Sequence, residues 1–186
     1  MTSYERIASE FSELEANPSI KNIVLLMDTP GGAVTGLHEL ATQIKSSTKN
    51  TQAYVMGYGA SAGYYLAVST NKIYMAPSAQ VGSIGTVFLW TDTRELDEKK
   101  GVKHYEIVSS VSPNKRLDPA TDAGRAELQS RADALGLQFA NYVAQQRGTD
   151  LETVTSKYGA GSVLLADNAV SVGMDDGIMT LSELLK

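Results

Sequence analysis

Hydrophobic and polar residues follow two different periods along the first half of the chain. Residues 3–16 place Ile7, Phe11 and Leu14 at helical spacing, which predicts an amphipathic helix. Residues 22–27 form a short, nearly continuous apolar run, typical of a strand buried on both faces of a parallel sheet. The same reasoning predicts, in chain order, a helix at 34–46, a strand at 52–56, a helix ending near 69, strands at 73–75 and 84–90, a helix at 95–100 and a strand at 104–108.

The second half of the chain has a mainly helical pattern. Asp118 and Pro119 open a long segment with one apolar face, and Gly148 ends it. Asp150 begins another helix, after which short strands and helices alternate. This order implies an α/β fold with a mostly parallel sheet covered by helices, and we expect residues 1–186 to form a single domain. The apolar face consists of Leu128, Ala132, Leu135, Phe139 and Val143.

Composition and charge exclude several classes of function. The 186 residues carry a net charge of −5 without a basic run, which argues against nucleic acid as a partner. Cysteine is absent and only 2 histidines occur, so disulfides, thiolate chemistry and a histidine-rich metal site are excluded. The sequence contains no apolar segment long enough to span a bilayer and no signal peptide at its start.

The most informative segment runs from Gly57 to Tyr65, where Ser61 stands among small residues between a predicted strand and a predicted helix. A sharp strand-to-helix turn holds a serine hydroxyl at the floor of a pocket beside free backbone N–H groups, which suits a nucleophile. The alternative is that Ser61 only caps the helix.

Two glycine-rich segments point to the same crevice. Gly31 and Gly32 follow the predicted strand at 22–27, and the carboxyl ends of parallel strands share one edge of a sheet. Backbone N–H groups exposed there can bind an oxyanion that develops during acyl transfer. The segment Gln80–Gly85 resembles a further loop of this kind. A plain turn at Gly31–Gly32 and a bulge at Gln80–Gly85 are the alternatives.

A serine nucleophile needs a base, and the chain offers few candidates. His38 and His104 both lie in polar surroundings typical of surface histidines. A lysine base must be neutral to accept the proton, so we expect it to be partly buried, with a lowered pKa. Lys115 lies in a polar loop directly after a predicted strand, from which a long side chain can reach into a crevice.

These residues, in this order, resemble the signal peptide peptidase A family of Ser–Lys proteases, which includes head-maturation proteases of tailed phages. The motifs are Asp28–Val34, Gly59–Tyr65 and Val81–Gly85, and the loop Ser112–Lys115 stands where the lysine loop of the family would fall. The resemblance extends over residues 22–177. It implies a ClpP/crotonase-like spiral of β-α units with a mostly parallel sheet.

The resemblance also implies a role for each site residue. Ser61 corresponds to the nucleophile and Lys115 to the general base. It implies no cofactor and no metal. The other implied roles are oxyanion-hole donors at Gly32 and Ala62, a lysine-orienting hydroxyl at Ser83, and substrate contacts at Gly31 and Gly59.

The expected activity is that of a serine endopeptidase with a Ser–Lys dyad, acting on extended peptides such as signal-peptide remnants or phage head and scaffold proteins. The family implies a homo-oligomeric ring, a tetramer or larger. We expect residues 1–186 to be one protease domain, or a fragment lacking an N-terminal strand or anchor. It would be soluble and cytoplasmic or phage-associated, or membrane-associated if an anchor has been lost. The alternatives are a catalytically inactive ring-forming assembly protein and a crotonase-like acyl-CoA enzyme.

Overall fold

The computed structural model describes residues 2–186, which separate into two compact units. The first unit combines the chain up to Gly85 with Leu137–Lys186, and the second is Thr86–Gly136. The long helix α5 (Asp122–Arg147) contributes to both. That residues 1–186 act as one protease domain stays a prediction.

The first unit is built around β2 (Asn50–Ala60), which pairs in parallel with three other strands. Further strands join in parallel beside β3 and antiparallel beside β4. The expected α/β fold with a mostly parallel sheet is therefore confirmed. The remaining strands are β1 (Asn22–Thr29), β3 (Lys72–Met75), β4 (Gln80–Gly82), β5 (Val163–Leu165) and β6 (Gly177–Ile178).

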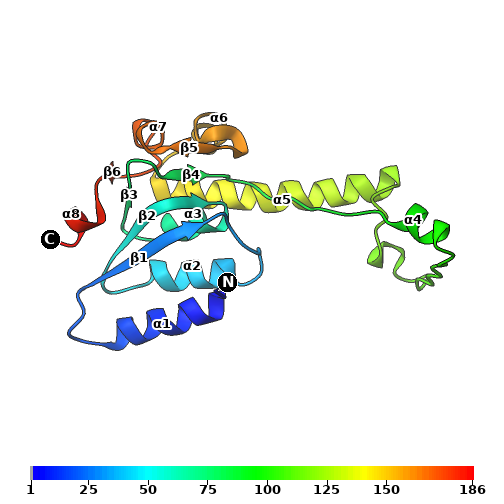
Figure 1. The fold of residues 1–186 in the computed structure, drawn as a ribbon, viewed down its shortest axis with the longest axis horizontal. Helices are drawn as coiled ribbons and strands as arrows, with labels where there is room; N and C mark the ends of the chain where they lie inside the picture. The colour runs from blue at the N-terminus through cyan, green and yellow to red at the C-terminus, as the bar shows by residue number, and fades with distance from the viewer. Residues whose placement is uncertain (1) are drawn as a thin grey trace. The chain divides into compact units, whose positions relative to one another are not determined.

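Helices α1 (Tyr4–Ala16) and α2 (Leu37–Lys45) lie next to each other on one side of β1 and β2 (Figure 1). Ser3 starts α1 because its hydroxyl accepts a hydrogen bond from the Arg6 N–H at 3.2 Å. The core between helices and sheet is apolar, as the sequence pattern predicts. The other helices of this unit are α3 (Ala62–Ala67), α6 (Leu151–Lys157), α7 (Ala166–Ser171) and α8 (Leu181–Leu184).

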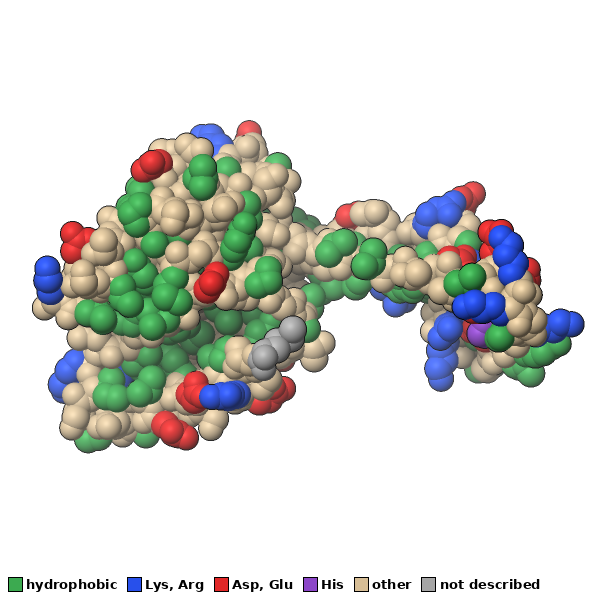
Figure 2. Space-filling view, viewed as in Figure 1, with side chains coloured by type: hydrophobic (Ala, Val, Ile, Leu, Met, Phe, Trp, Pro, Cys, Tyr) green, Lys and Arg blue, Asp and Glu red, His purple; other side chains and the backbone are tan. Residues whose placement is uncertain are grey.

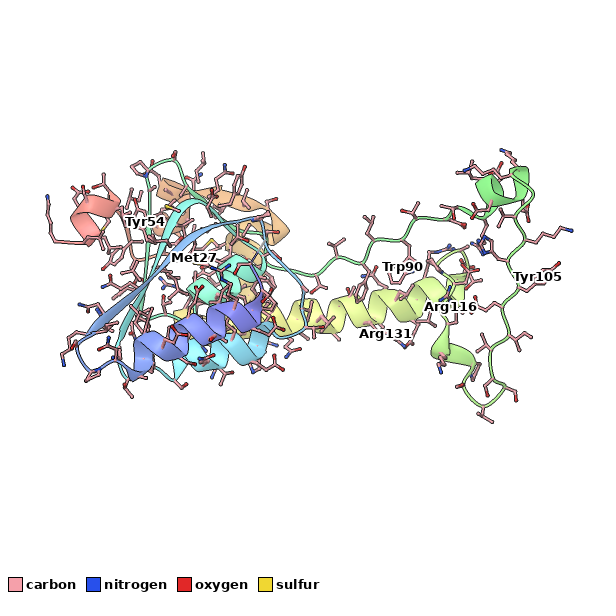
Figure 3. The ribbon with its side chains drawn as sticks, turned by 60° about the horizontal axis from the view of Figure 1, so that its bottom comes forward. Met27, Tyr54, Trp90, Tyr105, Arg116 and Arg131 are labelled. Atoms are coloured by element: carbon pink, nitrogen blue, oxygen red, sulfur yellow. The ribbon has the colours of Figure 1, made fainter. Side chains whose placement is uncertain are left out.

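The second unit exposes many apolar side chains. It contains α4 (Arg94–Lys99) and a single 3₁₀ turn at Pro113–Lys115. Figure 2 shows hydrophobic side chains at its surface among the charged ones. Trp90 is 50% exposed and Tyr105 is 86% exposed (both labelled in Figure 3). Ion pairs hold some of its segments together, with Arg94 bound to Asp118 at 2.7 Å.

Two of the predicted strands are wrong, those at 84–90 and 104–108. The chain turns away from the sheet at Gly82 and Ser83, whose φ angles are 125° and 53°. A strand needs a neighbouring strand for its backbone hydrogen bonds, and within residues 2–186 neither segment has one. The apolar pattern reflects exposed side chains instead, since Leu89 is 89% and Ile107 is 98% exposed.

One carboxyl group is buried without a partner near the end of the first unit. Asp175 is 4% exposed, and neither of its carboxylate oxygens has a hydrogen-bond partner among residues 2–186. The neighbouring Asp176 binds the two nearby cations, Arg147 at 3.1 Å and Lys72 at 3.0 Å. Burial raises the pKa of the Asp175 carboxyl to about 7, although the charge of Arg147 lowers it.

We expect Asp175→Asn to remove a pH dependence of stability. Unfolding returns the Asp175 carboxyl to its ordinary pKa of 3.8, against about 7 in the folded protein. Between these values the folded state holds a proton that the unfolded state has lost. The free energy of unfolding therefore falls as the pH rises, by up to about 1.4 kcal/mol per pH unit, and levels off above the higher value. Urea denaturation of the wild type and of Asp175→Asn across this pH range measures the difference. If the free energies of unfolding of the two proteins depend on pH in the same way, the prediction is contradicted.

Candidate functional site

Ser61 occupies a strained turn between β2 and α3. Its φ and ψ angles are 52° and −122°, a region that non-glycine residues rarely adopt. The turn is fixed on both sides, because the Ser61 N–H donates to the Gly82 carbonyl at 2.8 Å and the Ser61 carbonyl accepts from the Tyr65 N–H at 3.0 Å. The Ser61 hydroxyl makes no capping hydrogen bond to α3. The helix-cap alternative therefore has no support in the structure.

Ser83 lies at the neighbouring strand end. Ala60 and Gly82 are paired across β2 and β4 and are the last residues of these strands, so Ser61 and Ser83 are the first residues after them. Ser83 also has a positive φ, 53°, and its N–H donates to the Ser162 carbonyl at 2.9 Å. The structure thus brings the two predicted hydroxyls to adjacent carboxyl ends of the sheet.

The Gly31–Gly32 loop lies directly against Ser61. A methyl group added at Gly31 would fall 2.8 Å from the Ser61 Cβ and 3.1 Å from its Oγ. A methyl group added at Gly32 would fall 3.8 Å from the Ala62 Cβ. Gly31 has a φ of 130°, which favours glycine independently of the space available. Both glycines predicted from the sequence therefore belong to the surroundings of Ser61.

Two backbone N–H groups beside Ser61 are unused. Among residues 2–186, no carbonyl or side chain accepts a hydrogen bond from the N–H of Gly32 or of Ala62. Donors of this kind are what an oxyanion hole requires, because they can turn to a developing negative charge without first breaking another bond.

Gly59 has a packing reason to be glycine. It is buried, and a methyl group there would fall 2.9 Å from a methyl of Val55 and 3.3 Å from one of Val81. The absence of a side chain at Gly59 lets the strand ends approach closely. A contact between Gly59 and substrate stays a prediction.

The roles of two residues of this region were not predicted from the sequence. The Tyr4 hydroxyl donates to the Ala33 carbonyl at 2.7 Å and lies 2.6 Å from where a Gly32 side chain would begin. Burial raises the pKa of the Tyr4 phenol, so it remains a donor near neutral pH. Thr29 accepts the Gly31 N–H on its Oγ1 at 3.2 Å. Tyr4 lies far from the loop in sequence, so no local pattern signals it.

Lys115 belongs to the second unit, whereas Ser61, Gly32, Ala62 and Ser83 belong to the first. It ends the 3₁₀ turn at Pro113–Lys115 and is exposed, which differs from the partial burial expected of a lysine base. Its pairing with Ser61 therefore stays a prediction.

The two histidines have other partners. The His38 Nδ1 lies 2.9 Å from the Tyr65 hydroxyl, and its ring meets that of Tyr142 edge-on. The His104 Nε2 lies 3.1 Å from the Asp97 carboxylate within the second unit. In the part of the chain that the structure describes, no three acidic or histidine side chains gather to hold a metal ion. The same residues include no helix that is both long and apolar enough to cross a membrane.

We expect Gly31→Ala to lower the free energy of unfolding by about 3 kcal/mol, from backbone strain and overpacking against Ser61. Gly148→Ala is the matched control within the same unit. Gly148 has a φ of 63°, but nothing lies within 4 Å of an added methyl group. The control should therefore lose only about 1 kcal/mol. Urea denaturation measures both, and equal losses would contradict the close approach of Gly31 to Ser61.

Comparison with known proteins places the chain in a family. The model of peptidase family S49 matches residues 43–186, and that of Clp protease matches residues 1–82, in agreement with the fold. Capsid assembly protease C of Escherichia phage lambda is 29% identical, over 100% of this chain and 43% of its own length. "Putative protease MJ0651" of Methanocaldococcus jannaschii is 26% identical, over 94% of this chain and 57% of its own.

A third relative, "Putative signal peptide peptidase SppA" of Enterococcus faecium, is 23% identical over 94% of this chain and 52% of its own length. The chain thus spans about half the length of the curated relatives it matches. The S49 match covers most of the chain, including Ser61, Ser83 and Lys115. By that match, the chain belongs to peptidase family S49.

Proposed function

We propose that this chain is a serine endopeptidase in which Ser61 attacks the peptide carbonyl and Lys115 acts as the general base. The observation that carries the proposal is the setting of Ser61. Its backbone is strained, Gly31 lies against its side chain, and the unused N–H groups of Gly32 and Ala62 flank it.

The reaction is acyl transfer in two steps. The amine of Lys115 takes the proton of the Ser61 hydroxyl as its Oγ attacks the carbonyl carbon. The N–H groups of Gly32 and Ala62 stabilise the negative oxygen of the tetrahedral intermediate. Lys115 then returns the proton to the leaving amine, which gives an ester on Ser61. A water molecule, deprotonated by the same lysine, hydrolyses the ester and frees the enzyme.

The role of Lys115 rests on the family and on its position within the motif order. Ser83 has the role of orienting that lysine through a hydroxyl hydrogen bond. Its place at the strand end next to Ser61 supports this assignment. Gly31 and Gly59 would flank an extended substrate at the same edge of the sheet.

We propose extended segments of proteins as substrates. The names of two relatives indicate phage capsid assembly and the degradation of signal peptides as the settings of such cleavage. An extended peptide can pair with backbone groups beside the Gly31–Gly32 loop, as in other complexes formed by strand addition.

We also propose that copies of the chain associate into a ring. Residues 87–111 expose many large apolar side chains, and a monomer in water rarely leaves so many uncovered. Burial against a second copy would remove them from water. They are Val87, Phe88, Leu89, Trp90, Leu96, Val102, Tyr105, Ile107, Val108 and Val111.

Incubation of the chain with an unstructured protein, followed by mass spectrometry of the new N-termini, tests the proposed activity. We expect cleavage within the substrate at defined peptide bonds. If the substrate stays intact at high concentrations of the chain, and the chain still assembles into a ring, the alternative of an inactive assembly protein is favoured instead.

A further inference from the structure

Strands β1 and β2 change register just before the site. Met27 pairs with Val55, but Thr29 pairs with Gly59, so the single residue Asp28 of β1 faces a three-residue stretch of β2. A bulge of this kind leaves backbone groups of the longer strand without ladder partners.

The side chain of Asp28 lies at this bulge, where it is exposed. Its Oδ1 accepts a hydrogen bond from the Tyr58 N–H at 2.9 Å. A methyl group added at Gly57 would fall 2.6 Å from the same oxygen, so glycine at that position leaves room for the carboxylate. The carboxylate thus replaces a backbone carbonyl that β1 does not supply at this point.

The register that follows the bulge sets the geometry of the site. Thr29 and Gly59 are the last pair of the two strands, and Gly31 and Ser61 each follow that pair by two residues along the chain, beyond the strand ends. The equal offset brings Gly31 against Ser61, in agreement with the 2.8 Å distance between a Gly31 methyl and the Ser61 Cβ. A shift of this register would move the N–H of Gly32 away from the carbonyl that Ser61 attacks.

We infer that Asp28 is a positioning residue for the reaction: by closing the bulge in β2, it holds the Gly31–Gly32 loop in register with Ser61. The inference rests on the proposed function, since it assigns Asp28 to the geometry of that site. It attributes the effect to an oxygen acceptor at Oδ1 and not to the negative charge.

Asp28→Asn and Asp28→Ala separate these two attributes, because asparagine keeps the Oδ1 acceptor and loses the charge. Hydrogen exchange of the Tyr58 amide and steady-state hydrolysis are measured for both variants and the wild type. We expect Asp28→Ala to speed exchange at Tyr58 at least about tenfold. We expect it to lower kcat by about tenfold to a hundredfold, with KM nearly unchanged. Asp28→Asn should restore both values to near those of the wild type.

The inference would be overturned if Asp28→Ala had the same kcat and the same Tyr58 amide exchange rate as the wild type. If Asp28→Asn changes kcat and the exchange rate of the Tyr58 amide as much as Asp28→Ala does, the inference is also overturned, because the loss of the charge would then be responsible. A different outcome separates the two proposals. If the wild type hydrolyses no peptide while Tyr58 exchange still depends on Asp28, the proposed function falls and the anchoring of the bulge by Asp28 is supported.

Discussion

Ser61→Ala is expected to lower kcat for peptide hydrolysis by at least about 10³-fold. Without the Oγ no ester intermediate can form, and the N–H groups of Gly32 and Ala62 have no tetrahedral intermediate to stabilise. Alanine keeps the Cβ, so the backbone strain at Ser61 stays as it is. The free energy of unfolding should therefore remain within about 0.5 kcal/mol of the wild type. Hydrolysis of an unstructured protein and urea denaturation measure the two quantities.

Ser61→Gly separates the loss of the hydroxyl from any change in folding. Glycine adopts a φ of 52° with a ψ of −122° without the strain that a Cβ imposes. This variant should be as inactive as Ser61→Ala and more stable than the wild type by about 1 kcal/mol. A glycine variant less stable than the alanine variant would show that the turn is not strained, and substantial activity in either would show that Ser61 is not the nucleophile.

Lys115→Arg is expected to lower kcat by about 10²- to 10⁴-fold. Arginine preserves the positive charge and most of the length of the side chain, but it does not lose its proton in proteins and cannot act as a base. The substitution therefore tests proton transfer itself and not simple charge. The measurement is steady-state hydrolysis of an unstructured protein by this variant and by the wild type.

Lys103→Arg is the matched control, because Lys103 is another exposed lysine of the second unit. We expect the control to keep its activity within about twofold, as for other surface substitutions. If Lys115→Arg is as active as this control, Lys115 is not the base, and another group must take the proton of Ser61.

The sheet and most helices could be predicted from the sequence because their signals are local. The helix predicted at 3–16 from its apolar spacing is present as α1, with Phe11 of that face buried. The apolar runs at 22–27, 52–56 and 73–75 lie within β1, β2 and β3. The structure extends β2 to Ala60, so the strand leads directly into the turn at Ser61.

The strands predicted at 84–90 and 104–108 show the limit of this reasoning. Apolar and β-branched residues describe what a side chain prefers, but a strand forms only where a neighbouring strand accepts its backbone hydrogen bonds. Val87, Leu89 and Ile107 have strand-like side chains and remain exposed. A segment whose apolar residues contact another copy of the chain would have the same sequence pattern as a strand.

The site could be predicted only in part, for a related reason. Glycines at 31 and 32 and the serine at 61 have a signature in short motifs, and the structure brings them together. The contacts that hold them join distant parts of the chain, as Tyr4 with Ala33 and Asp28 with Tyr58. No spacing or periodicity reveals such pairs. They depend on the bulge between β1 and β2 and on the position of α1.

We propose that Ser61 is a nucleophile activated by its surroundings. Reaction of the chain with a fluorophosphonate, followed by peptide mapping in a mass spectrometer, tests it most directly. We expect one adduct per chain, located on Ser61, absent from Ser61→Ala and formed far more slowly in Lys115→Arg. An adduct on another serine such as Ser83, or none at Ser61 while the protein still cleaves peptide bonds, would contradict it.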